Sequence, residues 1–295
     1  MMPNNHGYLI ITPANNEEAH IRLTLDSIVA QTSQPTQWII VDDGSSDATA
    51  SIVTRYADMH PWIKLVKNLP SEVRRQGGGK VVRAFHCGYE AADITDFDFV
   101  VKLDADLTLP MSYFEEVAKC FASEPTVGMC GGFLTAQFNG VWKRERSARY
   151  HLRGNFKAYR KQCFAEIGGI RPVDNWDLLD EMTAMYLGWS VKILPLEVRH
   201  HRPTSTLINR GLRFSFAKGQ TYYKDGYDLF LLALRSAPYG LGTKPYVLSS
   251  LGLILGYLYS CWTRPEKYVD AGLERFIRKF QYNRIKSFLR VGALN

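Results

Sequence analysis

Short apolar runs alternate with amphipathic segments along the first third of the chain. The runs are Tyr8–Thr12, Trp38–Val41, Ile63–Val66 and Phe99–Leu103. Between the first two runs, Ile21, Leu25, Ile28 and Val29 recur at helical spacing, which predicts a helix there. Near-continuous apolar strands that alternate with helices are typical of a parallel sheet covered on both faces. The pattern therefore predicts an α/β fold.

Polar and acidic residues follow three of these four runs. They are Thr12 to Glu17, Asp42-Asp43, and Asp104 with Asp106. Ligands of open parallel sheets bind at the carboxyl ends of the strands. We therefore expect one binding site that collects residues from all three strand ends.

Asp104 and Asp106 stand two residues apart directly after the fourth run. Side chains at positions i and i+2 of an extended segment leave on the same side, so both carboxylates can face one point. Hard oxygen donors suit Mg²⁺ or Mn²⁺ that keeps open positions for a phosphate ligand. The alternative is that Asp104 forms a turn and Asp106 caps the helix predicted near Ser112–Ala122.

The composition restricts the partners and the compartment. The net charge of +7 favours an anionic partner, which can be a nucleotide, a phospholipid surface or nucleic acid. Five scattered cysteines without CxxC spacing fit reduced thiols in the cytosol. The polar start of the chain has no apolar signal-peptide core, and aromatic RNP and helix-turn-helix patterns are absent. We expect a cytoplasmic protein that does not bind nucleic acid.

Two common phosphate-binding motifs are missing. No GxGxxG follows the first run and no GxxxxGK[ST] occurs, which argues against a dinucleotide site or a P-loop. Gly77-Gly78-Gly79-Lys80 could still hold phosphate through backbone N–H groups and one cation. Its alternative is a plain surface loop.

Three ordered motifs resemble the nucleotide-sugar-binding half of family 2 glycosyltransferases. They are Ile11–Glu18, Val41–Asp47 and Leu103–Asp106. The family has the GT-A fold, a Rossmann-like, mixed but mainly parallel sheet with helices on both faces. The resemblance covers roughly residues 6–205. It implies a catalytic domain at residues 1–205, with a nucleotide-binding half at about 6–110 and an acceptor half at about 111–205. It implies an inverting transfer from a UDP-, GDP- or dTDP-type nucleoside-diphosphate sugar, with Mn²⁺ or Mg²⁺ on the diphosphate.

The resemblance also implies roles for individual residues. Those expected to bind the nucleotide sugar are Thr12, Pro13, Ala14, Glu17, either Asp42 or Asp43, Lys80, Asp104, Ala105, Arg153 and Arg160. Asp104-Ala105-Asp106 matches the family's DxD motif, in which Asp104 and Asp106 would hold the metal. Asn15 stands where the family commonly has a tyrosine.

An acidic stretch, Asp177 to Glu181, precedes Gly188-Trp189. Counting back from Gly188, Asp177 falls on the family's catalytic base, with Trp176 in place of its usual glutamate. Inversion needs a carboxylate that deprotonates the acceptor hydroxyl as it attacks. Asp180 and Glu181 are rivals for this role, and Asp177 could instead cap the helix.

Two histidines follow the predicted strand at Val191–Pro195. In some relatives a histidine at this place completes the metal shell, so His200 or His201 is a candidate ligand. Adjacent residues of an extended segment face opposite ways, so at most one of the pair points inward. The alternative is a surface or hydrogen-bonded pair.

Residues 206–295 form a basic, aromatic and helical appendage in this interpretation. Tyr246–Thr263 contains no charged residue, but its length and its small residues make it a borderline membrane span. Its aromatic residues suit a segment that lies in a membrane interface. The alternative is a buried helical hairpin.

The sequence thus predicts a metal-dependent glycosyltransferase with a glycan or polyprenyl-linked acceptor in cell-surface glycan or glycolipid synthesis. We expect it in the cytoplasm, with peripheral association with the cytosolic face of the membrane as one alternative. Two other functions stay open. One is a nucleotidyltransferase that acts on sugar phosphates, and the other is a catalytically inactive nucleotide-binding relative.

Overall fold

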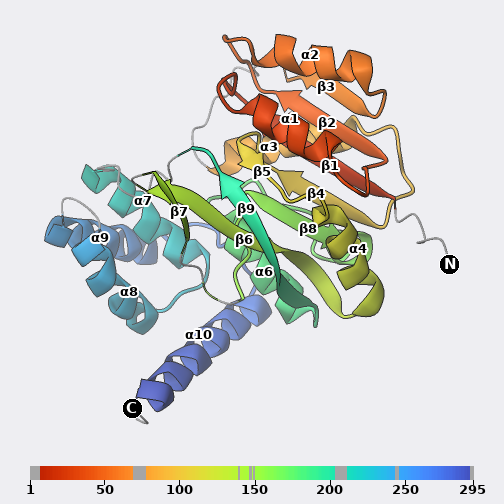
Figure 1. Cartoon of the computed structure of the whole chain (residues 1–295). Helices are drawn as coiled ribbons and strands as arrows, with labels where there is room; N and C mark the ends of the chain where they lie inside the picture. The colour runs from red at the N-terminus through yellow and green to blue at the C-terminus, as the bar shows by residue number, and fades with distance from the viewer. Residues whose placement is uncertain are drawn as a thin grey trace. The chain divides into compact units, whose positions relative to one another are not determined.

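The chain folds into two compact units, residues 1–203 and residues 204–295 (Figure 1). The structure is a computed structural model that describes residues 7–68, 78–138, 140–145, 148, 150–202, 211–242 and 246–292.

The first unit is built on a nine-stranded mixed sheet. Its strands are β1 (Tyr8–Ala14), β2 (Gln37–Asp42), β3 (Ile63–Lys67), β4 (Phe99–Leu103), β5 (Leu107–Thr108), β6 (Val127–Phe138), β7 (Val141–Arg144), β8 (Phe156–Arg160) and β9 (Ser190–His200). They lie in the order β3-β2-β1-β4-β8-β6-β9-β5, and β7 pairs with β6. The four strands β3, β2, β1 and β4 are parallel, as the apolar runs predict.

The other half of the sheet contains antiparallel pairs. β8 runs antiparallel to both β4 and β6, and β5 runs antiparallel to β9. Because β5 follows the DxD motif directly, its pairing with β9 sets Leu107 opposite His200. This register brings a segment from late in the unit to the end of β4. The prediction of a mixed, mainly parallel sheet is confirmed.

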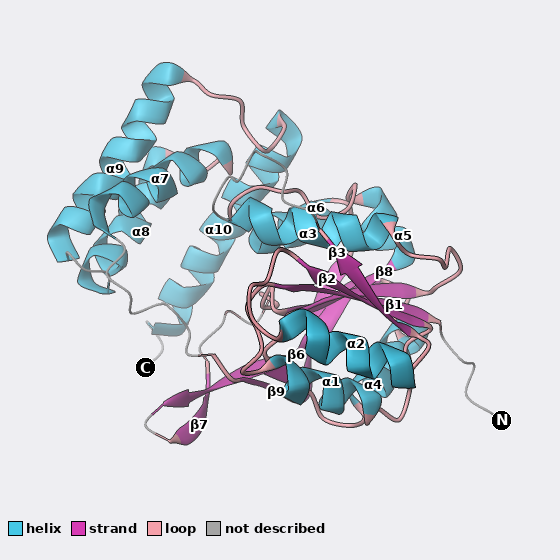
Figure 2. Cartoon of the chain, turned by 90° about the horizontal axis from the view of Figure 1, so that it is seen from above, coloured by secondary structure: helices cyan, strands magenta, loops and turns pink. Residues whose placement is uncertain are grey.

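Helices cover both faces of the sheet (Figure 2). On one face lie α1 (Ile21–Val29), α2 (Thr49–Met59) and α4 (Tyr113–Ser123), and on the other lie α3 (Gly78–Glu90), α5 (Lys161–Glu166) and α6 (Trp176–Tyr186). Successive strand residues point to opposite faces, so Tyr8 and Ile10 join one apolar core while Leu9 and Ile11 join the other. Both faces of the central strands are therefore buried.

The second unit is helical. Its helices are α7 (Gly211–Lys224), α8 (Leu229–Gly242), α9 (Tyr246–Thr263) and α10 (Ala271–Gly292). α9 packs against α7 and α8, and the hydroxyl of Tyr282 on α10 donates to Asp228 at the start of α8. In the part of the chain that the structure describes, no helix combines the length and the apolar character that crossing a bilayer would require.

Candidate active site

A cavity of about 360 Å³ lies where the parallel strands of the first unit end. Its lining residues are Pro13, Ala14, Asn15, Glu17, Asp43, Lys80, Val81, Ala84, Asp104, Ala105, Asp106 and Arg202. They come from the end of β1, from the loops after β1, β2 and β4, from the first turns of α3 and from the segment after β9. The strand ends therefore converge as the sequence pattern predicts.

The loops after β1 and β2 are tied to each other. The side-chain amide of Asn15 donates to the carbonyl of Asp43 at 2.9 Å. Asn16 adopts a left-handed φ of 57°, a conformation that asparagine tolerates better than most residues, and its side-chain oxygen accepts from the Ser46 amide at 2.8 Å. These bonds fix the wall of the cavity that β1 and β2 form.

The two aspartates at the end of β2 have different surroundings. Asp42 is buried and accepts a hydrogen bond from the Ser45 amide at 2.9 Å, so it closes the turn. Asp43 lines the cavity, where Lys80 lies 3.0 Å from its carboxylate and Asn68 donates to it at 2.8 Å. Of this pair, Asp43 is the residue that can reach a ligand.

Only part of the predicted glycine-rich loop can be placed. Gly77 lies outside the described residues, and Gly78 and Gly79 begin α3. Lys80 follows in the first turn of that helix and reaches the cavity. A cation on the first turn of a helix that points at the cavity suits an anionic ligand.

Asp104 is held by a residue of β4 and by a residue of the segment just before β8. Lys102 of β4 pairs with its carboxylate, and the Asn155 side chain donates to it at 2.6 Å. The Asp104 amide in turn donates to the Asn155 carbonyl at 2.7 Å. Burial raises the pKa of Asp104 above its ordinary value, although the Lys102 charge acts against that shift.

Asp106 lies against two cationic or potentially cationic side chains. His200 Nε2 is 3.1 Å from its carboxylate, and Arg202 Nε is 3.6 Å from the same oxygen. Burial acts to raise the pKa of Asp106, but the hydrogen bond and charge of His200, together with the charges of Arg202 and Lys102, hold that pKa below its ordinary value. Asp106 is therefore the more readily ionised member of the DxD pair.

The paired histidines separate as extended geometry requires. His200 is buried beside Asp106, and its Nδ1 is buried without a hydrogen-bond partner among the described residues. His201 points elsewhere, with Nε2 2.7 Å from the Thr108 hydroxyl and its ring against Trp142. Of the two, His200 is the one that faces the DxD motif.

The lining residues suit a divalent cation. Four carboxylates (Glu17, Asp43, Asp104 and Asp106) and two cationic side chains (Lys80 and Arg202) line the cavity. A diphosphate would meet an excess of negative charge there unless a cation offset it. Asp106 offers an ionised oxygen ligand, and His200 would offer an imidazole nitrogen once it has released its proton, a donor pair that fits Mn²⁺. Within the described part of the chain, no three His, Cys, Asp or Glu side chains are already arranged around a metal position.

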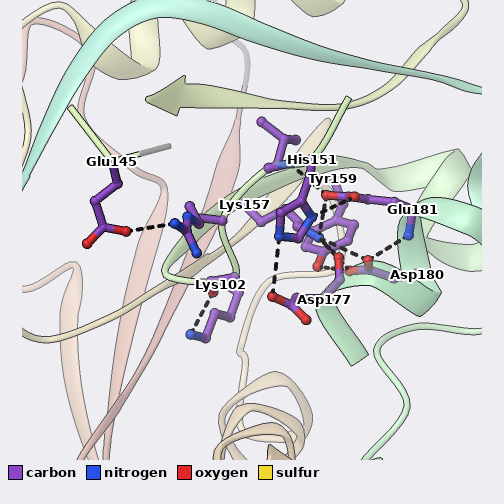
Figure 3. Close-up of polar contacts among 11 residues, drawn as sticks. Lys102, Glu145, His151, Lys157, Tyr159, Asp177, Asp180 and Glu181 are labelled. Atoms are coloured by element: carbon purple, nitrogen blue, oxygen red, sulfur yellow. Dashed lines mark hydrogen bonds and ion pairs between the residues drawn. The ribbon is translucent and has the colours of Figure 1, made fainter. Parts of the chain in front are cut away.

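The acidic cluster, defined here as Asp177, Asp180 and Glu181, lies at the start of α6 (Figure 3). The Asp177 side chain is 31% exposed, and His151 Nε2 lies 3.8 Å from its carboxylate. The segment before β8 approaches it closely, because a Cβ added to Gly154 would lie 3.1 Å from Asp177 Cβ. Asp177 is thus accessible and lies beside the segment that holds Asp104.

Asp180 and Glu181 are enclosed in the protein interior. Lys157 lies 2.9 Å from Asp180 and 3.0 Å from Glu181. Asp180 also accepts from the Tyr159 hydroxyl at 2.5 Å, and Glu181 accepts from the Leu152 amide at 2.8 Å (Figure 3). Burial raises the pKa of Asp180 to about 7 against the opposing charge of Lys157. These contacts leave the two rival carboxylates without access to an acceptor.

Three predicted ligand-binding residues do not reach the cavity. Thr12 is buried and accepts from the indole of Trp38 at 2.9 Å. Arg153 pairs with Glu145 at 2.8 Å. Arg160 stands opposite Phe99, at the end of β4 remote from the DxD motif.

Arg160 instead has a structural role that its position explains. Its guanidinium donates to the carbonyls of Val127, Phe121 and Glu124. Phe121 and Glu124 lie at the end of α4, whose last carbonyls lack helical partners.

The structure adds residues that the motifs do not mark. Arg202 pairs with Glu17 across 185 positions of sequence and also approaches Asp106. Lys102 and Asn155 orient Asp104. The sequence signal for Lys102 was its place inside an otherwise apolar strand. A lysine buried there needs an oppositely charged partner. For Arg202 the sequence gives no signal other than its position two residues after His200.

A sequence model described as glycosyl transferase family 2 matches residues 9–173. Dolichyl-phosphate beta-glucosyltransferase ALG5C of Trichomonas vaginalis is 33% identical over 125 residues, which are 40% of this chain and 34% of that protein. The chain spans about a third of the length of the curated relatives that it matches.

Solved structures show the same fold at low sequence identity. The mannosyltransferase PcManGT from Pyrobaculum calidifontis, in complex with GDP-Man and Mn²⁺, has a TM-score of 0.53 and 18% identity, covering 88% of each chain. TarS 1–349 from S. aureus, in complex with UDP-GlcNAc, has a TM-score of 0.54 and 16% identity, covering 87% of this chain and 73% of that one. These likenesses establish the GT-A fold. Since the family match covers more than half of the 295 residues, the chain belongs to glycosyl transferase family 2.

Proposed function

We propose that this glycosyltransferase moves a sugar from a nucleoside-diphosphate sugar to an acceptor hydroxyl, with inversion at the anomeric carbon and dependence on Mn²⁺ or Mg²⁺. The observation that carries the proposal is the separation of the acidic residues into two sets. Asp104 and Asp106 lie in the cavity at the end of β4, and Asp177 is partly exposed nearby at the start of α6.

The cavity residues have the chemistry to hold the donor. Lys80 and Arg202 supply positive charge for the diphosphate, and Asp43 and Asn15 supply polar contacts for the nucleoside. Asp106 and His200 would hold the cation, with Asp104 oriented by Lys102 and Asn155 beside them. When bound, the cation offsets the charge that develops on the leaving diphosphate.

Asp177 is the group that fits proton removal from the acceptor. A general base must be accessible to the hydroxyl that it deprotonates, and Asp177 meets that condition whereas Asp180 and Glu181 are buried. Those two carboxylates and Lys157 instead fix the first turns of α6, which carry the base. Asp177 would accept the proton as the acceptor oxygen attacks the anomeric carbon.

We infer that the acceptor is a glycan or a polyprenyl-linked molecule. The T. vaginalis relative is a dolichyl-phosphate glucosyltransferase, which supports a lipid-linked acceptor, although it shares only part of its length with this chain. The structurally similar proteins bind GDP-Man and UDP-GlcNAc, so both GDP and UDP donors are candidates alongside dTDP donors. We place the reaction in the cytoplasm, at the cytosolic face of a membrane.

Donor identity can be tested by thermal unfolding of the intact chain with UDP-, GDP- and dTDP-sugars, each with and without Mn²⁺. A bound donor raises the unfolding temperature, and we expect one nucleotide class to do so only with the metal. NMR of the first sugar released from an α-linked donor should show the β-anomer, whereas the α-anomer would contradict inversion. Formation of pyrophosphate from a nucleoside triphosphate and a sugar phosphate would instead indicate a nucleotidyltransferase.

A further inference from the structure

α9 of the second unit turns its small residues inward. Ser249, Gly252, Gly256 and Ser260 are buried along one side of the helix. A Cβ added to Gly256 would lie 1.9 Å from the Phe216 carbonyl oxygen of α7, and one added to Gly219 would lie 2.0 Å from the Leu253 carbonyl oxygen. The backbones of α7 and α9 therefore touch, in the small-residue packing that is common between membrane-embedded helices.

The outer face of α9 carries the large apolar side chains. We define it as Val247, Leu248, Leu251, Leu255, Leu258 and Trp262, whose exposed fractions range from 46% to 81%. A helix at the surface of a water-soluble domain shows the reverse arrangement, with its large apolar residues facing the core. So many exposed apolar residues on one helix face indicate a contact surface.

An apolar groove continues this face toward α7. It encloses about 420 Å³, and its lining includes Leu212, Phe216, Leu248, Leu251 and Leu255. Leu212 and Phe216 stand one helical turn apart on α7. The groove suits a hydrocarbon chain, which needs no hydrogen-bond partners.

The positive charge of the protein is concentrated in this unit. Residues 204–295 contain 14 Lys and Arg against 5 Asp and Glu, a formal net charge of +9, whereas residues 1–203 carry −2. Arg213 in the lining of the groove and Arg264 just after α9 are both exposed. Basic residues near an apolar surface attract the anionic headgroups of a bilayer. The same charge would repel a second copy of the unit.

We propose that the α7–α9 surface of residues 204–295 binds a membrane that contains anionic lipids, with α9 lying in the plane of the interface. The outer face of α9 enters the headgroup boundary, and lipid chains fill the groove beside it. Trp262 lies at the end of the helix, where an indole ring favours the membrane interface. This surface is separate from the transfer reaction, so its test needs neither donor nor acceptor.

Sedimentation of the intact chain with vesicles tests the proposal directly. We expect binding to vesicles of phosphatidylcholine mixed with phosphatidylglycerol, weaker binding to phosphatidylcholine alone, and weakening by salt, because exposed charges are screened. The double variant Leu251→Gln/Leu255→Gln should bind about tenfold less or weaker still, since two apolar groups no longer leave water. The matched control Met59→Gln/Met111→Gln changes two exposed apolar residues of the first unit and should bind as the unaltered chain does.

A second measurement does not depend on how the leucine variants fold. The fluorescence difference between the unaltered chain and Trp262→Phe reports on Trp262 alone, and we expect its emission to move to shorter wavelength when anionic vesicles are added. An unshifted Trp262 emission, or equal loss of binding in the Met59/Met111 control, would overturn the proposal. So would a dimer in solution that Leu251→Gln/Leu255→Gln converts to monomer while vesicle binding is absent, because the surface would then be covered by a second copy.

Discussion

Lys102 of β4 and Lys157 of β8 lie directly opposite each other on neighbouring antiparallel strands. Both side chains are buried, and their ammonium groups lie 5.3 and 5.7 Å from the centre of the same Trp176 ring. Like charges at opposed positions are destabilising unless each has a partner. Lys102 pairs with Asp104, and Lys157 pairs with Asp180 and Glu181.

This arrangement connects the two halves of the candidate site. Lys102 belongs to the strand that ends in the DxD motif, and Trp176 is the first residue of the helix that carries Asp177. The indole of Trp176 gives both cations a favourable face.

Replacing Lys157 should destabilise the fold rather than act on chemistry alone. Lys157→Met leaves two buried carboxylates without their cation, and removing one partner of a buried ion pair costs about 3 to 5 kcal/mol. Urea unfolding should show this loss. Lys143→Met, which removes an exposed lysine of β7, should leave the free energy of unfolding nearly unchanged, and equal losses in both variants would contradict the assignment.

Asp106→Ala should remove metal-dependent activity. The variant loses the ionised carboxylate that His200 and Arg202 hold, and we expect donor hydrolysis or transfer to fall by roughly a hundredfold or more. Calorimetric titration with Mn²⁺ should show weaker binding in parallel. Asp58→Ala, at an exposed position of α2, serves as the control, and unchanged activity of Asp106→Ala would rule out the metal assignment.

Asp177→Asn should separate binding from catalysis. The amide cannot accept the acceptor proton, so kcat should fall by about a hundredfold to ten-thousandfold while the donor raises the unfolding temperature as before. Steady-state kinetics and thermal unfolding with donor measure the two quantities. Full turnover by this variant would indicate that Asp180 or Glu181 is the catalytic base instead.

Glu17 should make the stability of the protein depend on pH. Burial raises the pKa of Glu17 from 4.5 to about 7, although the nearby Arg202 charge acts to lower it. The folded state therefore keeps a proton that the unfolded chain has already lost, so the free energy of unfolding falls as the pH rises from 4.5 to about 7. Glu17→Gln should flatten this part of the profile in urea unfolding. Parallel profiles for the two proteins would show that Glu17 does not carry the effect.

Much of the architecture follows from the sequence because burial imposes local periodicity. β1, β2 and β4 are buried on both faces, so their apolar runs are nearly continuous, and the helices between the strands repeat at helical spacing. The acidic residues after β2 and β4 mark the strand ends for the same local reason. Motif order along these ends then predicts the family, which the match over residues 9–173 confirms.

The tertiary structure decided which members of each candidate set are accessible. Asp42 and Asp43 are adjacent in sequence, yet one closes a turn and the other faces the cavity. Asp180 and Glu181 are buried by Lys157, which lies on a strand more than twenty residues earlier.

Long-range pairing also brings in residues that no local pattern identifies. Arg202 meets Glu17 because β5 pairs with β9 and returns the chain to the end of β1. Arg160 is carried away from the cavity because β8 runs antiparallel to β4. Local periodicity reports whether a position is buried, but the partner that buries or exposes a charged group comes from distant sequence. The sequence by itself therefore determined the secondary-structure elements and the family. Only the tertiary structure determined which carboxylates are accessible to a ligand.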